Sequence, residues 1–415
     1  MHNRTLILSL CCIAYSAAVS AQPAKPLGTV FYPASSVRTP QPLLAALSEG
    51  AKAFTNVAVF VPAVPLQPPT PSAPMPAPYF IETPPSIACV YGQVPQTAKC
   101  NPNATKTNPS GGSRTIAIVD AFDDPTVRSD LDAFSNRFAL PKANFDLIFA
   151  SGKRPGNDKG WEIEIALDVE WAHAMAPKAK ILLVEATSSS YQDLRTALDT
   201  ATDRLATQGG GEVSLSWGGA EFADQTTFNA SFKRKPGITY FAATGDSPGV
   251  NYPSTSADVV AVGGTTINRD AAGSYAGQTP WQDAGAGPSA FVPRPDYQKG
   301  VVSDNWRGVA DVSAIADPNT GGVWVYDSGN AQNTTNHGWL AVGGTSAATP
   351  IVASIANNSG RFATSSETEL RYIYAHVKEF SDIKSGSCGP LGKFSAKAGW
   401  DYCTGAGTPN GHGGL

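Results

Sequence analysis

The sequence predicts an α/β fold, with a doubly wound, mostly parallel sheet and helices on both of its faces. From residue 112 onward, short apolar segments of strand length alternate with longer helical segments. This alternation is typical of a parallel sheet built from β–α–β units. The strand segments are largely apolar, as expected of strands that are covered on both faces.

The expected strands are short apolar runs, namely residues 114–121, 179–186, 212–217, 238–243 and 258–263. The expected helices are residues 123–140, 161–177, 191–211 and 349–360. In the first helix we expect Asp124 as N-cap and Pro125 at the first helical position. The second helix ends before Pro177. The third is amphipathic and carries one apolar side, formed by Leu194, Leu198, Ala201 and Leu205, with Gly209 beyond its end.

The composition excludes some classes of partner. Charged residues make up 15 % of the chain, against about 25 % in an average protein. The net charge is −4 and the chain has no excess of basic residues, so we expect no nucleic acid as a partner.

The N-terminus has the pattern of a secretory signal peptide, residues 1–21. Arg4 precedes an apolar stretch, and small residues lead to a cleavage site after Ala21. A membrane anchor is the alternative, but the apolar run is short and ends in small residues. Leu10 precedes Cys11, which argues against a lipoprotein anchor. We therefore expect a secreted, extracellular or periplasmic protein with no membrane partner.

Four cysteines remain after cleavage, and four cysteines allow three pairings. We expect the local pairs, Cys89–Cys100 and Cys388–Cys403. Each would close a short loop worth about 3 kcal/mol in the chain-entropy model. No CxxC spacing supports the alternative, a metal site.

A proline-rich segment separates the N-terminal stretch from the expected core. Residues 62–78 contain eight prolines in 17 residues, which predicts an extended linker. We interpret residues 22–80 as a leader or propeptide, with a surface spacer as the alternative, and residues 81–415 as the catalytic domain.

The stretch GGTSAATP, residues 343–350, offers Ser346 as a nucleophile ahead of a helix. A serine nucleophile needs a base, and histidine is the usual one. None of the five histidines stands in a His-Gly-Thr setting at a helix start. The base must therefore be sought elsewhere.

Two carboxylates on the 161–177 helix are candidates for that base. Glu164 and Asp168 are four residues apart and share a helical face. A solvated acidic face is the ordinary explanation, but the residues around them are apolar on nearly every side, which indicates a buried helix. A buried carboxylate pair can share a proton, so it could serve Ser346 at acidic pH.

A third acid, Asp246, follows a strand and a glycine. A protonated aspartic acid can donate a hydrogen bond to a developing oxyanion. The alternatives are a turn aspartate and a lipase-type motif with Ser247 as nucleophile. Asp120, Trp217 and Asp246 all fall at or just past strand ends, where ligands bind in folds of this class.

Together these elements resemble the sedolisin (serine-carboxyl peptidase) family, which has a subtilisin-like fold. The matching pieces are EIALDVEWAHAMAPKAKILLV, SLSWGG, AATGD and GGTSAATP, in the family's order, and the resemblance covers residues 80–411. It implies that Ser346 is the nucleophile, Glu164 its general base and acid, and Asp168 the partner of Glu164. It also implies that Asp246 completes the oxyanion hole.

The resemblance implies further site residues. A hydrogen-bond network would run from Glu164 through Trp217 to Asp120, where the family usually has glutamate. The backbone of Trp217, Gly218 and Gly219 would pair with the substrate. A C-terminal calcium site would use the side chains of Asp382 and Asp401 and the carbonyls of Ile383, Lys397 and Gly399, all hard oxygen donors. The alternative to calcium is a glycine-rich loop held by the Cys388–Cys403 bridge.

We therefore expect a secreted, acid-acting serine endopeptidase that binds one structural Ca²⁺, acts on proteins or peptides and is a monomer. Three alternatives remain: a catalytically silent exported binding protein of the same fold, an esterase using Ser247, and an ordinary Ser-His-Asp protease. The last lacks a histidine in a suitable motif.

Overall fold

The computed structural model describes residues 27–36, 43–44, 51–330 and 337–415. The expected signal peptide, residues 1–21, lies outside the described residues. No helix among the described residues is long and apolar enough to cross a membrane.

The core is an eight-stranded sheet with the order β11-β10-β9-β7-β4-β6-β5, and β14 also pairs with β10. All of its pairs are parallel except β10–β11, which confirms the mostly parallel sheet. Its strands are β4 (Thr115–Ala121), β5 (Asn144–Phe149), β6 (Lys180–Ala186), β7 (Gly211–Leu215), β9 (Ile238–Ala243), β10 (Val260–Arg269), β11 (Tyr275–Pro280) and β14 (Val312–Ile315).

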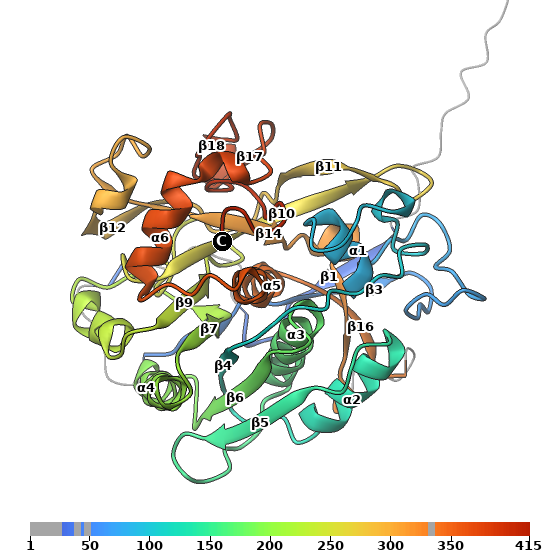
Figure 1. The fold of residues 1–415 in the computed structure, drawn as a ribbon, viewed down its shortest axis with the longest axis horizontal. Helices are drawn as coiled ribbons and strands as arrows, with labels where there is room; N and C mark the ends of the chain where they lie inside the picture. Colours follow the sequence, from blue (N-terminus) through green and yellow to red (C-terminus); the bar gives the residue numbers. More distant parts are fainter. Residues whose placement is uncertain (1–26, 37–42, 45–50, 331–336) are drawn as a thin grey trace, which may run out of the picture.

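Helices cover both faces of this sheet (Figure 1). The described helices are α1 (Pro84–Val90), α2 (Val127–Arg137), α3 (Lys159–Met175), α4 (Tyr191–Thr207), α5 (Thr345–Ser359) and α6 (Ser366–Ala375), of which α3, α4, α5 and α6 contact the sheet directly. Alternate residues of β4 pack on opposite sides: Ile118 joins a cluster with Ile165 of α3, and Val119 joins another with Leu194 of α4. Even-numbered residues of β4 such as Ile118 therefore face α3, and odd-numbered residues such as Val119 face α4.

The start of α2 corrects one expectation. The helix begins at Val127 with Thr126 as N-cap, so Asp124 is not the N-cap residue and Pro125 is not in the first turn. The Asp124 carboxylate accepts a hydrogen bond from the Thr126 amide at 2.8 Å. That bond closes a turn ahead of the helix, and regular helical geometry starts only after it.

The described strands of the segment interpreted as a leader pair with strands of the expected catalytic domain. β1 (Gly28–Phe31) and β3 (Ala58–Pro62) form a four-stranded sheet with β16 (Trp339–Gly343) and β15 (Val323–Tyr326) in the order β1-β3-β16-β15. A short strand, β2 (Phe54–Thr55), pairs with β8 (Trp217–Gly218). Two further pairs are β12 (Gly287–Pro293) with β13 (Trp306–Val309) and β17 (Ser387–Cys388) with β18 (Phe394–Ser395).

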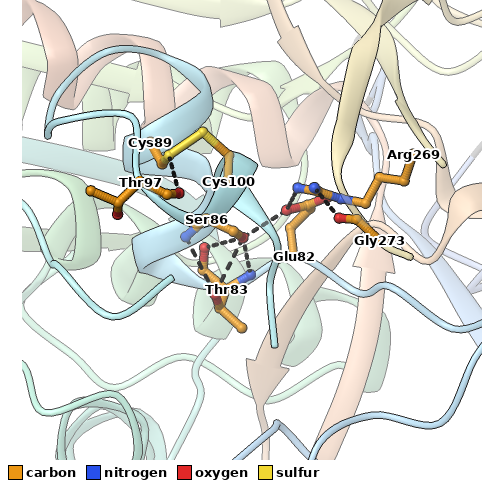
Figure 2. Close-up of a disulfide and its surroundings, with 8 residues drawn as sticks. All are labelled: Glu82, Thr83, Ser86, Cys89, Thr97, Cys100, Arg269 and Gly273. Atoms are coloured by element: carbon orange, nitrogen blue, oxygen red, sulfur yellow. Dashed lines mark hydrogen bonds and ion pairs between the residues drawn. A yellow bond between two sulfur atoms is a disulfide. The ribbon is translucent and has the colours of Figure 1, made fainter. Parts of the chain in front are cut away.

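Both expected disulfides, Cys89–Cys100 and Cys388–Cys403, are present. Figure 2 shows the first one, in which Cys89 near the end of α1 is joined to Cys100, together with residues at the start of that helix. There Glu82 forms a buried ion pair with Arg269 of β10 at 2.6 Å, and Ser86 donates to Glu82 at 2.6 Å. The chain from Glu82 onward is therefore fixed to the central sheet by contacts that do not involve the leader.

Candidate active site

Ser346 lies in the first turn of α5, directly after the strand β16. The turn between them passes through Gly344, whose φ of +104° favours glycine. Ser346 is fully buried, and its hydroxyl donates to the backbone oxygen of Ser216 at 2.9 Å. A serine in the first turn of a helix presents its backbone N–H outward, because the first amides of a helix have no partner within it.

The carboxylates expected to serve Ser346 are brought to it by α3. Glu164 and Asp168 are both fully buried, and neither oxygen of Glu164 has a hydrogen-bond partner. The Ser216 hydroxyl donates to Asp168 Oδ1 at 2.8 Å. Ser216 therefore contacts both Ser346 and Asp168. Ser216 is not among the residues predicted from the sequence, although its place just after β7, next to Trp217, is a usable signal.

Asp120 lies near this pair, but the expected network to it is not formed as predicted. The indole N–H of Trp217 donates to the backbone oxygen of Val119 at 2.8 Å and not to Asp120. Asp120 has the same parity as Ile118, so it faces α3. It is fully buried, and neither of its oxygens has a partner. It acts on Glu164 and Asp168 through charge and not through the indole.

Asp120, Glu164 and Asp168 hold protons more tightly than carboxyl groups in water do. Burial raises the pKa of Glu164 well above its usual value, and the charges of Asp168 and Asp120 raise it further, while the nearby Ser346 hydroxyl opposes the rise. Burial and then Asp120 raise the pKa of Asp168, against its bond from Ser216. Burial also raises the pKa of Asp120 to about 8. Such a cluster retains protons at acidic pH and can pass one on.

Asp246 lies three residues past β9 and contacts Thr345, the residue before Ser346. Its Oδ1 accepts hydrogen bonds from the backbone N–H and the hydroxyl of Thr345, at 2.7 and 2.9 Å. Its Oδ2 is buried without a partner. Burial raises the pKa of Asp246 to about 8, against these two bonds. At acidic pH the side chain is therefore neutral and can donate from Oδ2.

Three described histidines, His173, His376 and His412, bond to backbone groups and not to Ser346. His173 contacts the Pro141 carbonyl at 2.8 Å, His376 contacts the Tyr372 carbonyl at 2.8 Å, and His412 bonds to a backbone group of α5. Burial lowers the pKa of His173 and His412. These side chains are held by backbone, as packed histidines are.

The expected substrate strand is already paired. Phe54 and Thr55 of β2 lie opposite Gly218 and Trp217. Gly219 exchanges two backbone hydrogen bonds with Tyr252, at 3.0 and 2.9 Å, so its own peptide groups are engaged. Of the three residues expected to bind substrate, Trp217 and Gly218 are therefore paired with β2, and Gly219 is paired with Tyr252.

The expected calcium residues lie on one loop. Asp382 Oδ2 accepts from the Gly399 amide, and Asp401 Oδ2 from the Lys397 amide, both at 3.0 Å. No three His, Cys, Asp or Glu side chains converge as a metal cluster within the part of the chain that is described. A carboxylate oxygen has two lone pairs, so the two aspartates can still bind a cation beside these amides. Two carboxylates with backbone carbonyls suit Ca²⁺.

Residues 154–389 match Peptidase_S8, the subtilase family. Kumamolisin from Bacillus sp. (strain MN-32) is 31 % identical over 302 residues, which cover 63 % of this chain and 52 % of that protein. Sedolisin from Pseudomonas sp. (strain 101) is 25 % identical over 344 residues, covering 72 % and 57 %. Tripeptidyl-peptidase 1 from Dictyostelium discoideum is 28 % identical over 357 residues, covering 75 % and 55 %.

The chain spans about half the length of these curated relatives. Among solved structures, Pseudomonas sedolisin (serine-carboxyl proteinase), complexed with two molecules of pseudo-iodotyrostatin, has a TM-score of 0.65 at 24 % identity, covering 80 % of this chain and 96 % of that one. At that identity the likeness concerns the fold alone, which is the expected subtilisin-like one. With the family match covering more than half of its residues, the chain belongs to the subtilase family, as a sedolisin-like member.

Proposed function

We propose that this protein is a secreted serine-carboxyl endopeptidase that acts at acidic pH. One observation carries the proposal: a buried serine in the first turn of α5 lies among carboxyl groups with raised pKa values, and the described histidines His173, His376 and His412 bond elsewhere. Kumamolisin, sedolisin and tripeptidyl-peptidase 1 as relatives support peptidase chemistry. The substrates are accordingly proteins or peptides.

The reaction begins when the Ser346 hydroxyl attacks the carbonyl carbon of the scissile peptide bond. Its hydroxyl leaves the Ser216 carbonyl and passes the proton to Glu164. The backbone N–H of Ser346 and the protonated Asp246 stabilise the oxyanion. Glu164 then protonates the leaving amine, and water hydrolyses the ester on Ser346 by the same route.

The acidic working range follows from two requirements on the carboxyl groups. Asp246 must stay protonated to donate, and its pKa of about 8 provides this at any acidic pH. Glu164 must be ionised to accept a proton, while Asp168 and Asp120 keep a proton within the cluster. Rising pH removes the shared protons and places several negative charges in a buried site, which disfavours the oxyanion.

The proposal includes one structural Ca²⁺. Its ligands would be the carboxylates of Asp382 and Asp401 and the carbonyls of Ile383, Lys397 and Gly399. Such an ion would hold the C-terminal loop, which is also closed by the Cys388–Cys403 bridge. It would take no part in the chemistry at Ser346.

The test is casein hydrolysis across acidic and neutral pH by the full chain and by Ser346→Ala, each preincubated at acidic pH. We expect acid-peaked hydrolysis that the variant lacks. Hydrolysis that peaks above neutral pH, or that survives in Ser346→Ala, contradicts the proposal. Matched circular dichroism spectra show that the variant is folded.

A further inference from the structure

A second group of buried acids lies on α3, on the side opposite to Glu164 and Asp168. At about 100° per residue, Glu162 and Glu170 project to that other side of the helix. Both α2 and β15 pack against α3, and Figure 1 shows α2 beside α3. Five acidic residues on or next to these elements, each at most 2 % exposed, form what we call the acid cluster: Asp124, Asp130, Glu162, Glu170 and Asp327.

The acid cluster binds the chain at the end of β15 and directly after it. The N–H of Tyr326, the last residue of β15, donates to Glu170 Oε2 at 2.9 Å. Ser328 donates to Asp130 from its backbone N–H at 3.0 Å and from its hydroxyl at 2.7 Å. This part of the chain is therefore tied to α3 through Glu170 and to α2 through Asp130.

Lys159 of α3 holds the next residue, Gly329. The Lys159 ammonium donates to the Gly329 carbonyl at 2.7 Å and to Glu162 Oε2 at 2.6 Å. A Cβ built on Gly329 would lie 3.1 Å from Glu162 Oε2 and 3.4 Å from Asp327 Oδ1, so these two carboxyl groups are neighbours. Among the ion pairs of the described residues, Lys159 is the one cation that contacts the acid cluster. The cluster therefore holds more carboxyl groups than cations.

Two oxygens of the acid cluster, Asp124 Oδ2 and Glu170 Oε1, are buried without a hydrogen-bond partner. Such an oxygen is costly to bury as part of an anion and less costly as part of a neutral carboxyl group. Outside the cluster, Glu185 of β6 accepts from the Asp124 N–H at 3.4 Å, and the nearby guanidinium of Arg154 is held by Asp123 at 2.9 Å. The surroundings of Asp124 therefore add further carboxyl groups.

Burial raises the pKa of Asp124 to about 6 and that of Asp327 to about 7, and the charges of the neighbouring acids contribute to both shifts. Burial also raises the pKa of Glu170 well above its usual value, against its bond from Tyr326. These values lie above the value of about 4 in an unfolded chain. The stability that the protonated acids contribute is therefore present at acidic pH and is lost as the pH rises through about 6 to 7.

We propose that the acid cluster is a pH-sensitive switch, which holds residues 326–329 on α2 and α3 at acidic pH and releases them when its carboxyl groups ionise. Ionised carboxyl groups in one buried volume repel each other strongly, because the protein interior screens charge less than water does. Asp327 belongs to the released residues, so their movement carries its charge away from Asp124 and into water. Since α3 is buried along nearly its whole length, residues 326–329 are the part that moves.

The strand pairing connects this switch to the nucleophile. In the β15–β16 pair, Tyr326 lies opposite Trp339. From Trp339 the strand β16 runs to Gly343, and the chain then passes through Gly344 to Ser346. Release of residues 326–329 removes support from the strand that precedes Ser346, so activity should fall with it. This consequence for activity rests on the proposed function, whereas the switch itself does not.

The experiment measures hydrogen exchange of the full-length Ser346→Ala chain by mass spectrometry, in steps from about pH 5 to about pH 8. The readout is the protection factor of peptides that cover residues 323–330, corrected for the intrinsic exchange rate at each pH. One pH unit above the pKa of Asp327, the ionised form outnumbers the neutral form about tenfold. We therefore expect protection to fall at least about tenfold across this range, while peptides from β4 and β6 keep theirs. Unchanged protection of residues 323–330 overturns the inference.

A double substitution, Asp124→Asn with Asp327→Asn, assigns the effect to the acid cluster. Asparagine keeps the shape of each side chain and cannot ionise, so we expect residues 323–330 to stay protected at about pH 8. Asp203→Asn is the matched control, because Asp203 is exposed and pairs with Arg234 on the surface; it should lose protection as the parent chain does. Loss of protection in the double variant equal to that of the parent overturns the inference. The series on the parent chain decides the question even if the double variant does not fold.

The outcomes separate this inference from the proposed function. With Ser346 in place, the double variant should hydrolyse casein at acidic pH as the wild-type protein does, since neither aspartate contacts Ser346. If residues 323–330 stay protected at about pH 8 while the wild-type protein hydrolyses casein, the switch fails and the peptidase stands. If protection is lost as expected and no casein is hydrolysed at any pH, the switch stands and the proposed function fails.

Discussion

Replacing Gly344 by alanine tests the geometry around the oxyanion site. The residue has φ +104°, and an added Cβ would overlap Asp246 Oδ2 and Asn56 O and lie 2.9 Å from Asn56 C. The ψ of 162° at Gly344 places it in a backbone region that is essentially restricted to glycine and costs other residues roughly 1–3 kcal/mol. The overlap adds a second effect, because the carbonyl must move away from its hydrogen-bond donors. Loss of one oxyanion donor costs about 10²–10³ in kcat, or about 2.7–4 kcal/mol.

Gly360→Ala is the matched control for this variant. Gly360 caps the other end of α5 with φ +70°, and an added Cβ meets nothing within 4 Å. We expect Gly360→Ala to lose roughly 1–2 kcal/mol of unfolding free energy and Gly344→Ala to lose more, because its Cβ also overlaps Asn56 O; urea denaturation measures both losses. Only Gly344→Ala should lose kcat on casein, by about 100-fold or more. Activity of Gly344→Ala within about threefold of Gly360→Ala would refute the placement of the oxyanion at Gly344.

Three further predictions concern protons, positioning and metal. The pKa of Asp120 and of Asp246 is raised to about 8, above the value of about 4 in an unfolded chain. Because the folded state binds more protons between these two values, the melting temperature measured by calorimetry should fall as the pH rises from about 5 to 8. A melting temperature that rises over this range would contradict the burial of uncompensated carboxyl groups. Ser216→Ala removes the hydrogen bond that lowers the pKa of Asp168. We therefore expect the acidic limb of the pH–kcat profile to move to higher pH while the variant stays folded. If that limb stays where it is in the wild-type protein, Ser216 has only a structural role. A chelator should lower the melting temperature of the wild-type protein, and added Ca²⁺ should restore it. The melting temperature of Asp382→Ala should respond to neither. If that variant responds as the wild-type protein does, the proposed loop is not the calcium site.

The central sheet, both disulfides and the Glu164–Asp168 pair on α3 could be predicted from the sequence because they depend on local patterns. Glu164 and Asp168 share a face through their four-residue spacing, and that face is buried because its neighbours are apolar. The helix start at Val127 was missed because Asp124 closes a turn with Thr126 before the helix begins. Two good turn-forming side chains two residues apart cannot be ranked from sequence alone.

The contacts across the active site could not be predicted from the sequence, since they join segments far apart in the chain. Asn56 meets Ser216 and Ser346 across 160 and 290 residues, and a proline- and alanine-rich leader has no periodicity to mark it as a strand. The Trp217 indole was assigned to Asp120, but parity places Asp120 on the opposite face of β4 from Val119. The indole, on the Val119 side, bonds to the nearer backbone oxygen.

The most direct test of serine-carboxyl catalysis is the pH dependence of casein hydrolysis by Glu164→Gln beside the wild-type protein and Ser346→Ala. Glutamine keeps the size of Glu164 and removes its proton chemistry, so we expect a loss of about 10² to 10⁴ at every pH, with Ser346→Ala inactive. If Glu164→Gln keeps the wild-type rate and profile while Ser346→Ala is inactive, another group is the base and the account is wrong.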